Sequence, residues 1–300
     1  MDKKKKKKKK ALIVGLSYRD DPVRTLMRGP INSAVYLKKL LMKEFEFSQK
    51  DITLVTDALG KTPTDKEIIN HLLNLLANAQ PGDIFLFYYI GHGGRRESKE
   101  YNNNSGYIEY ISLGKNAEGV KTFISDNTLR HIVEPLPQGC SFTFMADCCC
   151  SGALLEGATE IFGSSTQFPV TDKIPAPMTE HLDLKRVDLS NCRKLGILFS
   201  ACQSFETTGG KYCDVKRKQV AYFTDTVIAI INKFGVNISN RFLFEKIKEA
   251  YVEDGKEQSP GLYCDISQVD LLFLSLEEAE TSQLPENSEQ AKLTDNQPRE

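Results

Sequence analysis

The chain has no apolar run long enough to cross a membrane as a helix. Its longest hydrophobic segments have the length of a strand, far short of the roughly 20 residues that a membrane helix needs. The lysine-rich N-terminus is not followed by the longer apolar segment and cleavage site of a secretory signal peptide. We therefore expect a soluble protein of the cytoplasm or the nucleus, whose eight cysteines are reduced thiols.

Basic residues are outnumbered by acidic ones outside the N-terminal lysine run. Lys3 to Lys10 hold eight of the 39 Lys and Arg residues, so the remaining chain has 31 basic residues against 40 acidic ones. We interpret residues 1–10 as a solvated poly-lysine arm, with a nuclear signal or a contact with nucleic acid or anionic lipid as weaker interpretations. Because acidic residues outnumber basic ones in the rest of the chain, we expect no nucleic-acid partner beyond a contact of this arm, and no membrane partner.

Cysteine and histidine do not recur at the spacing of a zinc site, and no internal repeat is visible. What the sequence does contain is an alternation of apolar and amphipathic segments. Apolar runs predict strands at residues 11–17, 51–57, 83–94, 141–147, 195–201 and 269–275. Helical spacing and capping residues predict helices at residues 32–45, 64–79, 125–134, 221–234 and 240–251. This pattern predicts an α/β fold with a mostly parallel six-stranded sheet that helices cover on both faces.

The composition changes twice after the fourth predicted strand. Residues 155–194 mix Gly, Ser, Thr, Pro and charged residues with little periodicity, which predicts a flexible linker. The linker separates a large part, residues 11–154, from a small part of the same domain, residues 195–275. Residues 276–300 are acidic and polar and are predicted to be disordered.

Two of the predicted strands end in reactive side chains. The third strand leads to His92 in a Gly-His-Gly-Gly turn, and the fourth leads to Asp147 and the triplet Cys148 to Cys150. Ligands of open α/β sheets bind at the carboxyl ends of the strands. If these strands are neighbours, an imidazole faces a thiol that it can convert to the nucleophilic thiolate. A structural histidine, a common glycine turn and packed or metal-binding cysteines would each explain one feature, but the combination favours a cysteine hydrolase.

These motifs resemble, in the same order along the chain, those of the metacaspases, which are caspase-like cysteine proteases. The similar segments are ALIVGLSY (11–18), YIGHGG (89–94), DCCCSG (147–152), GILFSACQSFET (196–207) and SPGLYCD (259–265). The resemblance covers roughly residues 11–275 and is closest to the plant type II members. It implies a caspase-like (caspase-hemoglobinase) sandwich fold, a zymogen, a monomer, and a role in programmed cell death or stress responses.

The resemblance also implies the roles of individual residues. Cys149 aligns with the nucleophile and His92 with the general base, while the backbone N–H groups of Gly93 and Cys149 align with the oxyanion hole. Cys148 and Cys150 replace a serine and a histidine of the family pattern. Asp147 aligns with an acid at the base of the pocket for the residue before the cut. An acid there implies protein or peptide substrates with Arg or Lys, rather than the Asp that caspases take.

The chain departs from the family pattern around this pocket. The family has an Asn-Asp pair whose Asp is the second pocket acid, and here the pair is Asn32-Ser33. Asp147 is then the single acid left to bind a basic side chain, which predicts weaker binding of Arg or Lys. The family block Asp-Glu-Ala/Cys-Ile-Val-Pro-Cys-Asp corresponds here to IEYISLGK (108–115), in which only Glu109 and Ile111 match the family pattern.

We also expect the activation of this chain to differ from that of the family. In several members an acid-rich loop is linked to calcium activation, and the corresponding segment here reads SKEYNNNSGY (98–107). Calcium prefers clustered oxygen ligands, and Glu100 is the single acidic residue of this segment. We expect weak calcium dependence or none, and no other cofactor or metal. Members of the family cut their own linker at a basic residue, and the corresponding residues here are Lys173, Lys185 and Arg186.

Three hypotheses follow from these observations. The first is an active cysteine endopeptidase directed to Arg and Lys, which the retained Cys149, His92 and Asp147 favour. The second is a degenerate metacaspase that binds partners without cutting, which Ser33 and the rewritten block 108–115 favour. The third is a thiol sensor or metal site built on the cysteine triplet. We rank the first hypothesis above the others because neither the nucleophile nor the base is eroded.

Overall fold

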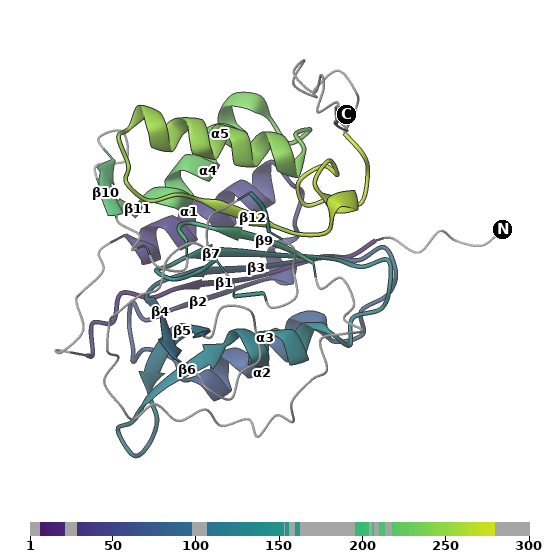
Figure 1. Ribbon diagram of the computed structural model, residues 1–300. Coiled ribbons are helices and arrows are strands. Elements are labelled where there is room, and N and C mark those ends of the chain that lie inside the picture. Colours follow the sequence, from purple (N-terminus) through teal and green to yellow (C-terminus); the bar gives the residue numbers. More distant parts are fainter. Residues whose placement is uncertain are drawn as a thin grey trace, which may run out of the picture.

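A seven-stranded sheet runs through the middle of the protein, with helices on both faces (Figure 1). The computed structural model describes residues 7–21, 29–97, 107–152, 154–155, 160–162, 196–203, 206, 210–213 and 218–279. The strand order is β2 (Ile52–Thr56), β1 (Lys9–Gly15), β3 (Ile84–Ile90), β7 (Ser141–Asp147), β9 (Ile197–Ser200), β12 (Gly261–Tyr263) and β8 (Glu160–Phe162). The first five strands are parallel, and β12 is antiparallel to both of its neighbours. The predicted α/β class and mostly parallel sheet are confirmed, with seven strands in place of six.

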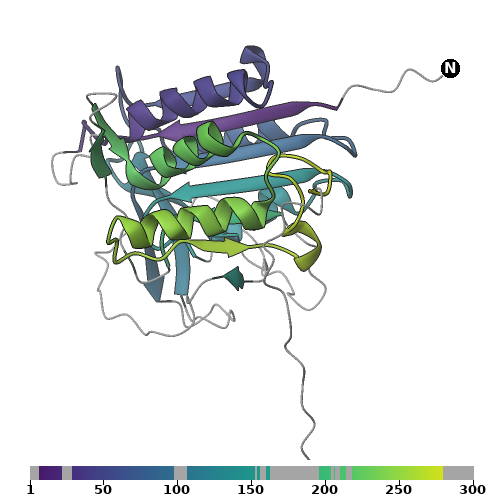
Figure 2. The same cartoon turned by 90° about the horizontal axis from the view of Figure 1, so that it is seen from above.

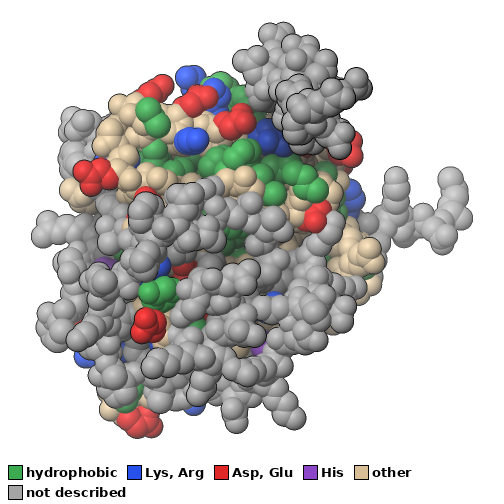
Figure 3. Space-filling model, in the orientation of Figure 1, with side chains coloured by type: hydrophobic (Ala, Val, Ile, Leu, Met, Phe, Trp, Pro, Cys, Tyr) green, Lys and Arg blue, Asp and Glu red, His purple; other side chains and the backbone are tan. Residues whose placement is uncertain are grey.

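The helices divide between the two faces of the sheet. On one face lie α1 (Pro30–Lys43), α4 (Tyr222–Phe234) and α5 (Asn240–Glu253), which are also seen from above in Figure 2. On the other face lie α2 (Asp65–Leu76) and α3 (Asp126–Val133). Short 3-10 helices occupy Gln49–Asp51 and Ile266–Gln268. Ion pairs at α5 join Arg241 to Asp270 and Lys246 to Glu249. Positive and negative side chains mix on the face of the molecule that Figure 3 shows.

The central strands are apolar throughout because they are buried on both faces. In β3, Leu86 and Tyr88 face the α1, α4 and α5 layer, and Phe85, Phe87 and Tyr89 face the α2 and α3 layer. All seven residues of β3 are buried. A parallel strand covered on both sides has no solvent face, so it carries no alternation of polar residues.

One predicted strand is wrong. Residues 269–275 form turns with isolated bridges at Leu271 and Leu272, whereas the sheet at this side is completed by β12 and β8. The apolar residues of the segment fill the core, since Val269, Phe273 and Leu274 are buried in the same hydrophobic cluster as α1, α4 and α5. An apolar run of this length indicates burial but does not by itself distinguish a strand from a packed turn.

The structure contains two smaller sheets that were not predicted. One joins β4 (Gly93–Glu97), β5 (Tyr107–Lys115) and β6 (Lys121–Ser125), and the other is the hairpin of β10 (Gly210–Cys213) and β11 (Lys218–Ala221). The predicted strand 83–94 is therefore two strands, because the chain leaves the main sheet after Ile90 and enters the second sheet at Gly93. The predicted helices all form, with ends that differ by a few residues.

The last two lysines of the N-terminal run belong to β1 rather than to an arm. Lys9 Nζ donates to the Phe45 carbonyl at 3.1 Å, and Lys10 Nζ donates to the carbonyls of Leu75 and Ala77, both at 3.5 Å. Consecutive strand residues point to opposite faces, so the two ammonium groups reach the C-terminal ends of α1 and α2 on either side of the sheet. Cations are favourable at these ends because helix C-termini carry partial negative charge.

Parts of the predicted domain plan lie outside the described residues. Residues 160–162 of the predicted linker form β8, whereas Lys173, Lys185 and Arg186 are not among the residues described. The same holds for Glu100 and for most of the predicted tail. Of the helices that the structure describes, none is long and apolar enough to cross a membrane.

Candidate active site

His92 and the cysteine triplet follow two neighbouring strands. β3 and β7 pair in parallel with Ile90 opposite Asp147, and the Gly91 N–H donates to the Asp147 carbonyl at 3.2 Å just beyond that pair. His92 and Cys149 each lie two residues past this register position. The predicted adjacency of the two strand ends is therefore present, and it brings the histidine turn and the cysteine turn to the same edge of the sheet.

Gly93 shows how closely the two turns approach. A Cβ atom at this position would lie 2.2 Å from the Cys149 carbonyl oxygen and 2.9 Å from Cys148 Sγ. Real Cβ atoms essentially never come within 3.0 Å of another heavy atom, so only glycine fits between the turns without a backbone shift. The Gly-His-Gly spacing thus has a packing reason in addition to the predicted role of the Gly93 N–H.

The three cysteines of the triplet differ in their surroundings. Cys148 is fully buried, and burial raises the pKa of its thiol well above the ordinary value, an effect that neighbouring Cys202 adds to. Cys149 and Cys150 are half-buried, and Cys150 has a φ of 50° in the left-handed region. Since the thiolate is the reactive form, Cys148 is the poorest nucleophile of the three on burial alone.

Cys202, in the segment that follows β9, is hydrogen-bonded to the cysteine turn. Its thiol donates to the Cys148 carbonyl at 3.3 Å, and its own carbonyl accepts from Ser151 Oγ at 3.3 Å. The Cys150 N–H donates to the Glu206 carbonyl at 3.3 Å, so the segment after β9 holds the turn on both sides of Cys149. Burial raises the pKa of the Cys202 thiol, which keeps it protonated as a donor.

Asp147 is fully buried and contacts the first turn of α4. Its Oδ2 accepts from the Thr224 N–H at 3.0 Å and from Thr224 Oγ1 at 2.7 Å. The carboxylate thus satisfies an N-terminal amide of α4, for which the N-cap Ala221 offers no side chain. Thr224 was not predicted as a site residue, because nothing in the sequence links it to a strand end 77 residues earlier.

Ser33, which replaces the expected second acid, lies at the same end of α4. Its Oγ accepts from the Ala221 N–H at 2.9 Å, and the neighbouring Asn32 donates to the Gln219 carbonyl at 2.8 Å. Ser33 is fully buried. The Asn-Ser pair therefore ties α1 to the entry of α4, while Asp147 ties β7 to the same turn.

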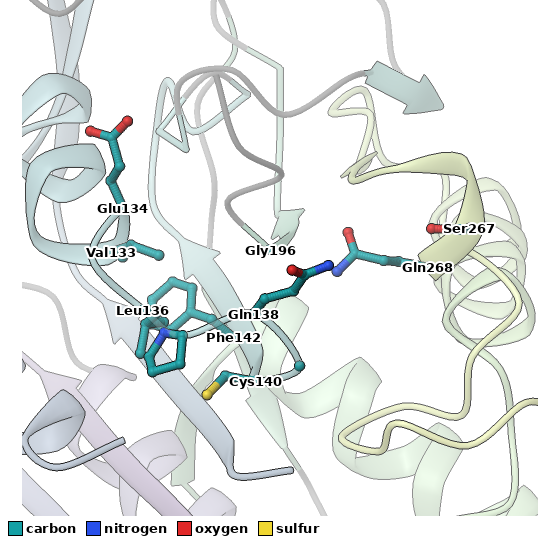
Figure 4. A pocket seen from close by; sticks show the side chains of 11 residues that line it. Val133, Glu134, Leu136, Gln138, Cys140, Phe142, Gly196, Ser267 and Gln268 are labelled. Carbon is teal, nitrogen blue, oxygen red and sulfur yellow. The ribbon is translucent and has the colours of Figure 1, made fainter. Parts of the chain in front are cut away.

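A separate cavity of about 330 Å³ opens at the other end of the strands. It is lined by residues that precede or begin β7 and β9, including Cys140, Phe142 and Gly196, together with Gln138 and Gln268 (Figure 4). Parallel strands carry their carboxyl ends at the opposite edge, where His92 and Cys149 lie, so this cavity is not part of the predicted active site. Within the described part of the chain, no group of three or more His, Cys, Asp or Glu side chains is placed to hold a metal ion.

The first comparison concerns protein families and curated relatives. A sequence model described as metacaspase, peptidase C14 domain, matches residues 9–158, half of the chain. Metacaspase-8 of Arabidopsis thaliana is 33% identical over 164 residues, which cover 53% of this chain and 41% of that protein. The chain spans about four-tenths of the length of the first curated relatives. Metacaspase-9 of the same plant is 26% identical over an alignment that covers 88% of this chain and 96% of that protein.

The second comparison concerns solved structures, and it shows a shared fold. A protein from Geobacter sulfurreducens superposes with a TM-score of 0.62 at 16% identity, covering 90% of this chain and 100% of that one. Caspase-1 from Spodoptera frugiperda superposes with a TM-score of 0.55 at 12% identity, covering 86% and 88%. The fold is therefore caspase-like. With a family match over the strands that carry His92 and Cys149, the chain belongs to the metacaspase family, peptidase C14.

Proposed function

We propose that this chain is a cysteine endopeptidase that cleaves proteins on the carboxyl side of Arg or Lys, with Cys149 and His92 as the catalytic dyad. The observation that carries the proposal is the parallel pairing of β3 and β7, which puts His92 and Cys149 at the same position past adjacent strand ends. The half-buried state of Cys149, beside a fully buried Cys148, supports Cys149 as the nucleophile.

The proposed reaction proceeds through an acyl-enzyme. The Cys149 thiol gives its proton to His92, and the sulfur attacks the scissile carbonyl carbon. The backbone N–H groups of Gly93 and Cys149 donate to the oxyanion that forms. His92 then protonates the leaving amine as the C–N bond breaks, which leaves a thioester on Cys149. Water, deprotonated by His92, attacks the thioester and releases the carboxylate product, and the thiol recovers its proton.

The substrate pocket is proposed to rely on a single acid. Asp147 supplies the negative charge for a basic side chain, but its Oδ2 already accepts two hydrogen bonds from Thr224. Ser33 contributes an oxygen without charge. We therefore propose that the KM for Arg and Lys substrates is high, and that Ser33→Asp lowers it by restoring a second carboxylate.

A second candidate function is a scaffold that keeps the fold and binds proteins without cutting. Two contacts favour it: Asp147 is engaged by Thr224 and Ser33 by the Ala221 N–H, so both side chains hold α4 without a substrate. The endopeptidase predicts hydrolysis of peptides after Arg or Lys, whereas the scaffold predicts no hydrolysis.

The test is hydrolysis of fluorogenic peptides that end in Arg, Lys or Asp, under reductant, with calcium or with a calcium chelator. Wild type is compared with Cys149→Ala and with Cys148→Ser, a matched change at the neighbouring cysteine. The proposal predicts cleavage after Arg or Lys that is lost in Cys149→Ala, retained in Cys148→Ser and little changed by calcium. Absence of cleavage by folded protein in all conditions would support the scaffold, and cleavage after Asp would contradict the proposed specificity.

A further inference from the structure

Two buried tyrosine hydroxyls hold the backbone of His92. The His92 N–H donates to the Tyr18 hydroxyl at 2.8 Å, and the Tyr89 hydroxyl donates to the His92 carbonyl at 2.8 Å. The two hydroxyl oxygens are 2.6 Å apart, and both side chains are buried. The Tyr18 ring also packs against the imidazole, with ring centroids 4.7 Å apart and planes tilted by 38°. Both backbone polar groups of His92 and one face of its ring are therefore fixed by tyrosines.

The same hydroxyls anchor His92 to the second sheet. The Ser112 carbonyl in β5 lies 2.8 Å from the Tyr18 hydroxyl and 2.7 Å from the Tyr89 hydroxyl. Because each phenol has a single proton and that of Tyr89 goes to the His92 carbonyl, Tyr18 is the donor to Ser112. The Ser112 N–H in turn donates to the His92 carbonyl at 2.9 Å. These hydrogen bonds restrict the movement of the histidine turn, because loss of the Tyr18 hydroxyl removes the acceptor that it offers to the His92 N–H.

Gly91 is required for this arrangement. A Cβ atom at Gly91 would lie 2.6 Å from the Tyr18 hydroxyl and 2.7 Å from the Tyr89 hydroxyl. Any other residue before His92 would displace both hydroxyls. The glycine before the histidine therefore serves the tyrosine contacts, and the glycine after it serves the approach of the cysteine turn.

Tyr18 reaches His92 from an unusual backbone conformation that Asp57 holds in place. Tyr18 has a φ of 56°, in the left-handed region that residues other than glycine rarely adopt. The Asp57 carboxylate accepts a short hydrogen bond from the Tyr18 N–H and accepts from the Ser17 N–H at 2.8 Å. Asp57 is fully buried, directly after β2, while Tyr18 follows the paired strand β1. Backbone outliers of this kind persist where the surroundings determine them, and they cluster at functional sites.

From these contacts we infer that Asp57 and Tyr18 are positioning residues for His92. The Asp57 carboxylate fixes the backbone that follows β1, and this backbone conformation directs the Tyr18 phenol toward the histidine turn. The phenol in turn fixes the position of the His92 backbone and ring relative to Cys149. Asp57 acts through Tyr18, and Tyr18 acts by holding the backbone and one ring face of His92. The inference rests on the proposed function, in which His92 is the general base.

The test compares Tyr18→Phe, which removes the hydroxyl and keeps the ring, with Tyr18→Leu, which removes both. Asp57→Asn probes the carboxylate, and Tyr222→Phe is the matched control. The Tyr222 hydroxyl donates to Asp254 at 2.8 Å in the core layer on the other face of the sheet. For each folded variant, kcat and KM for an Arg peptide are measured per titrated active site.

The second readout needs no peptide substrate. The rate of alkylation of Cys149 by iodoacetamide is followed from pH 5 to 9, with the modified cysteine located by mass spectrometry. We expect kcat to fall about tenfold in Tyr18→Phe and about 100-fold in Tyr18→Leu, with KM within about twofold, because misplacement of a catalytic group by about 1 Å has effects of this size. The midpoint of the alkylation profile should move to higher pH by about one unit in Tyr18→Leu, as His92 stabilises the thiolate less well. Asp57→Asn should move both readouts in the same direction, and Tyr222→Phe should move neither.

The outcomes separate this inference from the proposed function. Variants that lose thermal stability but keep wild-type kcat per site and the wild-type alkylation midpoint would overturn the inference, since Tyr18 and Asp57 would then be structural only. A shifted alkylation midpoint in a protein whose wild type cleaves no peptide would uphold the positioning role and would refute the peptidase proposal.

Discussion

Gly93→Ala is the most specific perturbation that the active-site geometry suggests. The added methyl would lie 2.2 Å from the Cys149 carbonyl oxygen, against a practical lower limit of 3.0 Å. The obstructing atom belongs to the backbone, so the histidine and cysteine turns must separate by about 1 Å. Misplacement of this size costs about 100-fold in kcat, or about 2.7 kcal/mol of transition-state stabilisation. Alanine keeps the N–H that we assign to the oxyanion hole, so the loss reports displacement of the histidine turn, with its N–H, from the cysteine turn rather than removal of a donor.

The assay is the steady-state hydrolysis of an Arg peptide, with thermal unfolding measured in parallel. Gly60→Ala is the matched control, because a Cβ at Gly60 meets no atom within 4 Å and its backbone needs no left-handed conformation. We expect Gly60→Ala to keep wild-type kcat. Full activity of Gly93→Ala would refute the argument that close contact between the two turns sets the catalytic geometry.

Three further predictions concern stability. Thr224→Val should lower the free energy of unfolding by about 1.5–3 kcal/mol in urea titrations, because it removes a hydrogen bond to the buried carboxylate of Asp147, and unchanged stability would contradict the contact. Lys10→Met should cost about 0.3–1 kcal/mol, an effect that salt screens, and a loss independent of salt would argue against a charge at the α2 C-terminus. Burial raises the pKa of Cys148 well above its ordinary value and that of Cys264 to about 12, so these thiols stay protonated in the fold while unfolded thiols ionise. The contribution of these protonated thiols to the free energy of unfolding is complete below about pH 8.5 and is lost as pH rises toward the pKa of the folded state. A free energy of unfolding that does not change with pH above about 8.5 would contradict this prediction.

The sheet could be predicted where burial dictates the sequence. β3 and β7 are buried on both faces, so both strands are apolar along most of their length and were located within a few residues. The segment 269–275 is also apolar, but it fills the core as turns, and hydrophobicity alone does not separate these two cases. β4 was missed as a separate strand because Gly93–Glu97 has neither an apolar run nor a clean alternation.

The adjacency of the two turns that form the candidate active site could be predicted for a similar reason. His92 and the triplet Cys148 to Cys150 follow strong strands, and the rule that ligands bind at carboxyl ends of parallel strands points to both turns. The choice of Cys149 within the triplet came from the resemblance to the metacaspases. The contacts of Tyr18 with His92 depend on a left-handed backbone and on the pairing of β1 with β2, which no local pattern encodes. Asp147 was identified by its place in a motif, whereas its contact with Thr224 required the fold that brings α4 to the end of β7.

Cys149, activated by His92, is the proposed nucleophile of this site. The most direct measurement is labelling with a peptidyl-Arg chloromethyl ketone, followed by mass spectrometry of the fragment that contains Cys148, Cys149 and Cys150. We predict one adduct per chain, on Cys149, which is strongly reduced in His92→Ala and absent in Cys149→Ala. An adduct on Cys148 or Cys150, or labelling of Cys149 that is unaffected by His92→Ala, would contradict the claim.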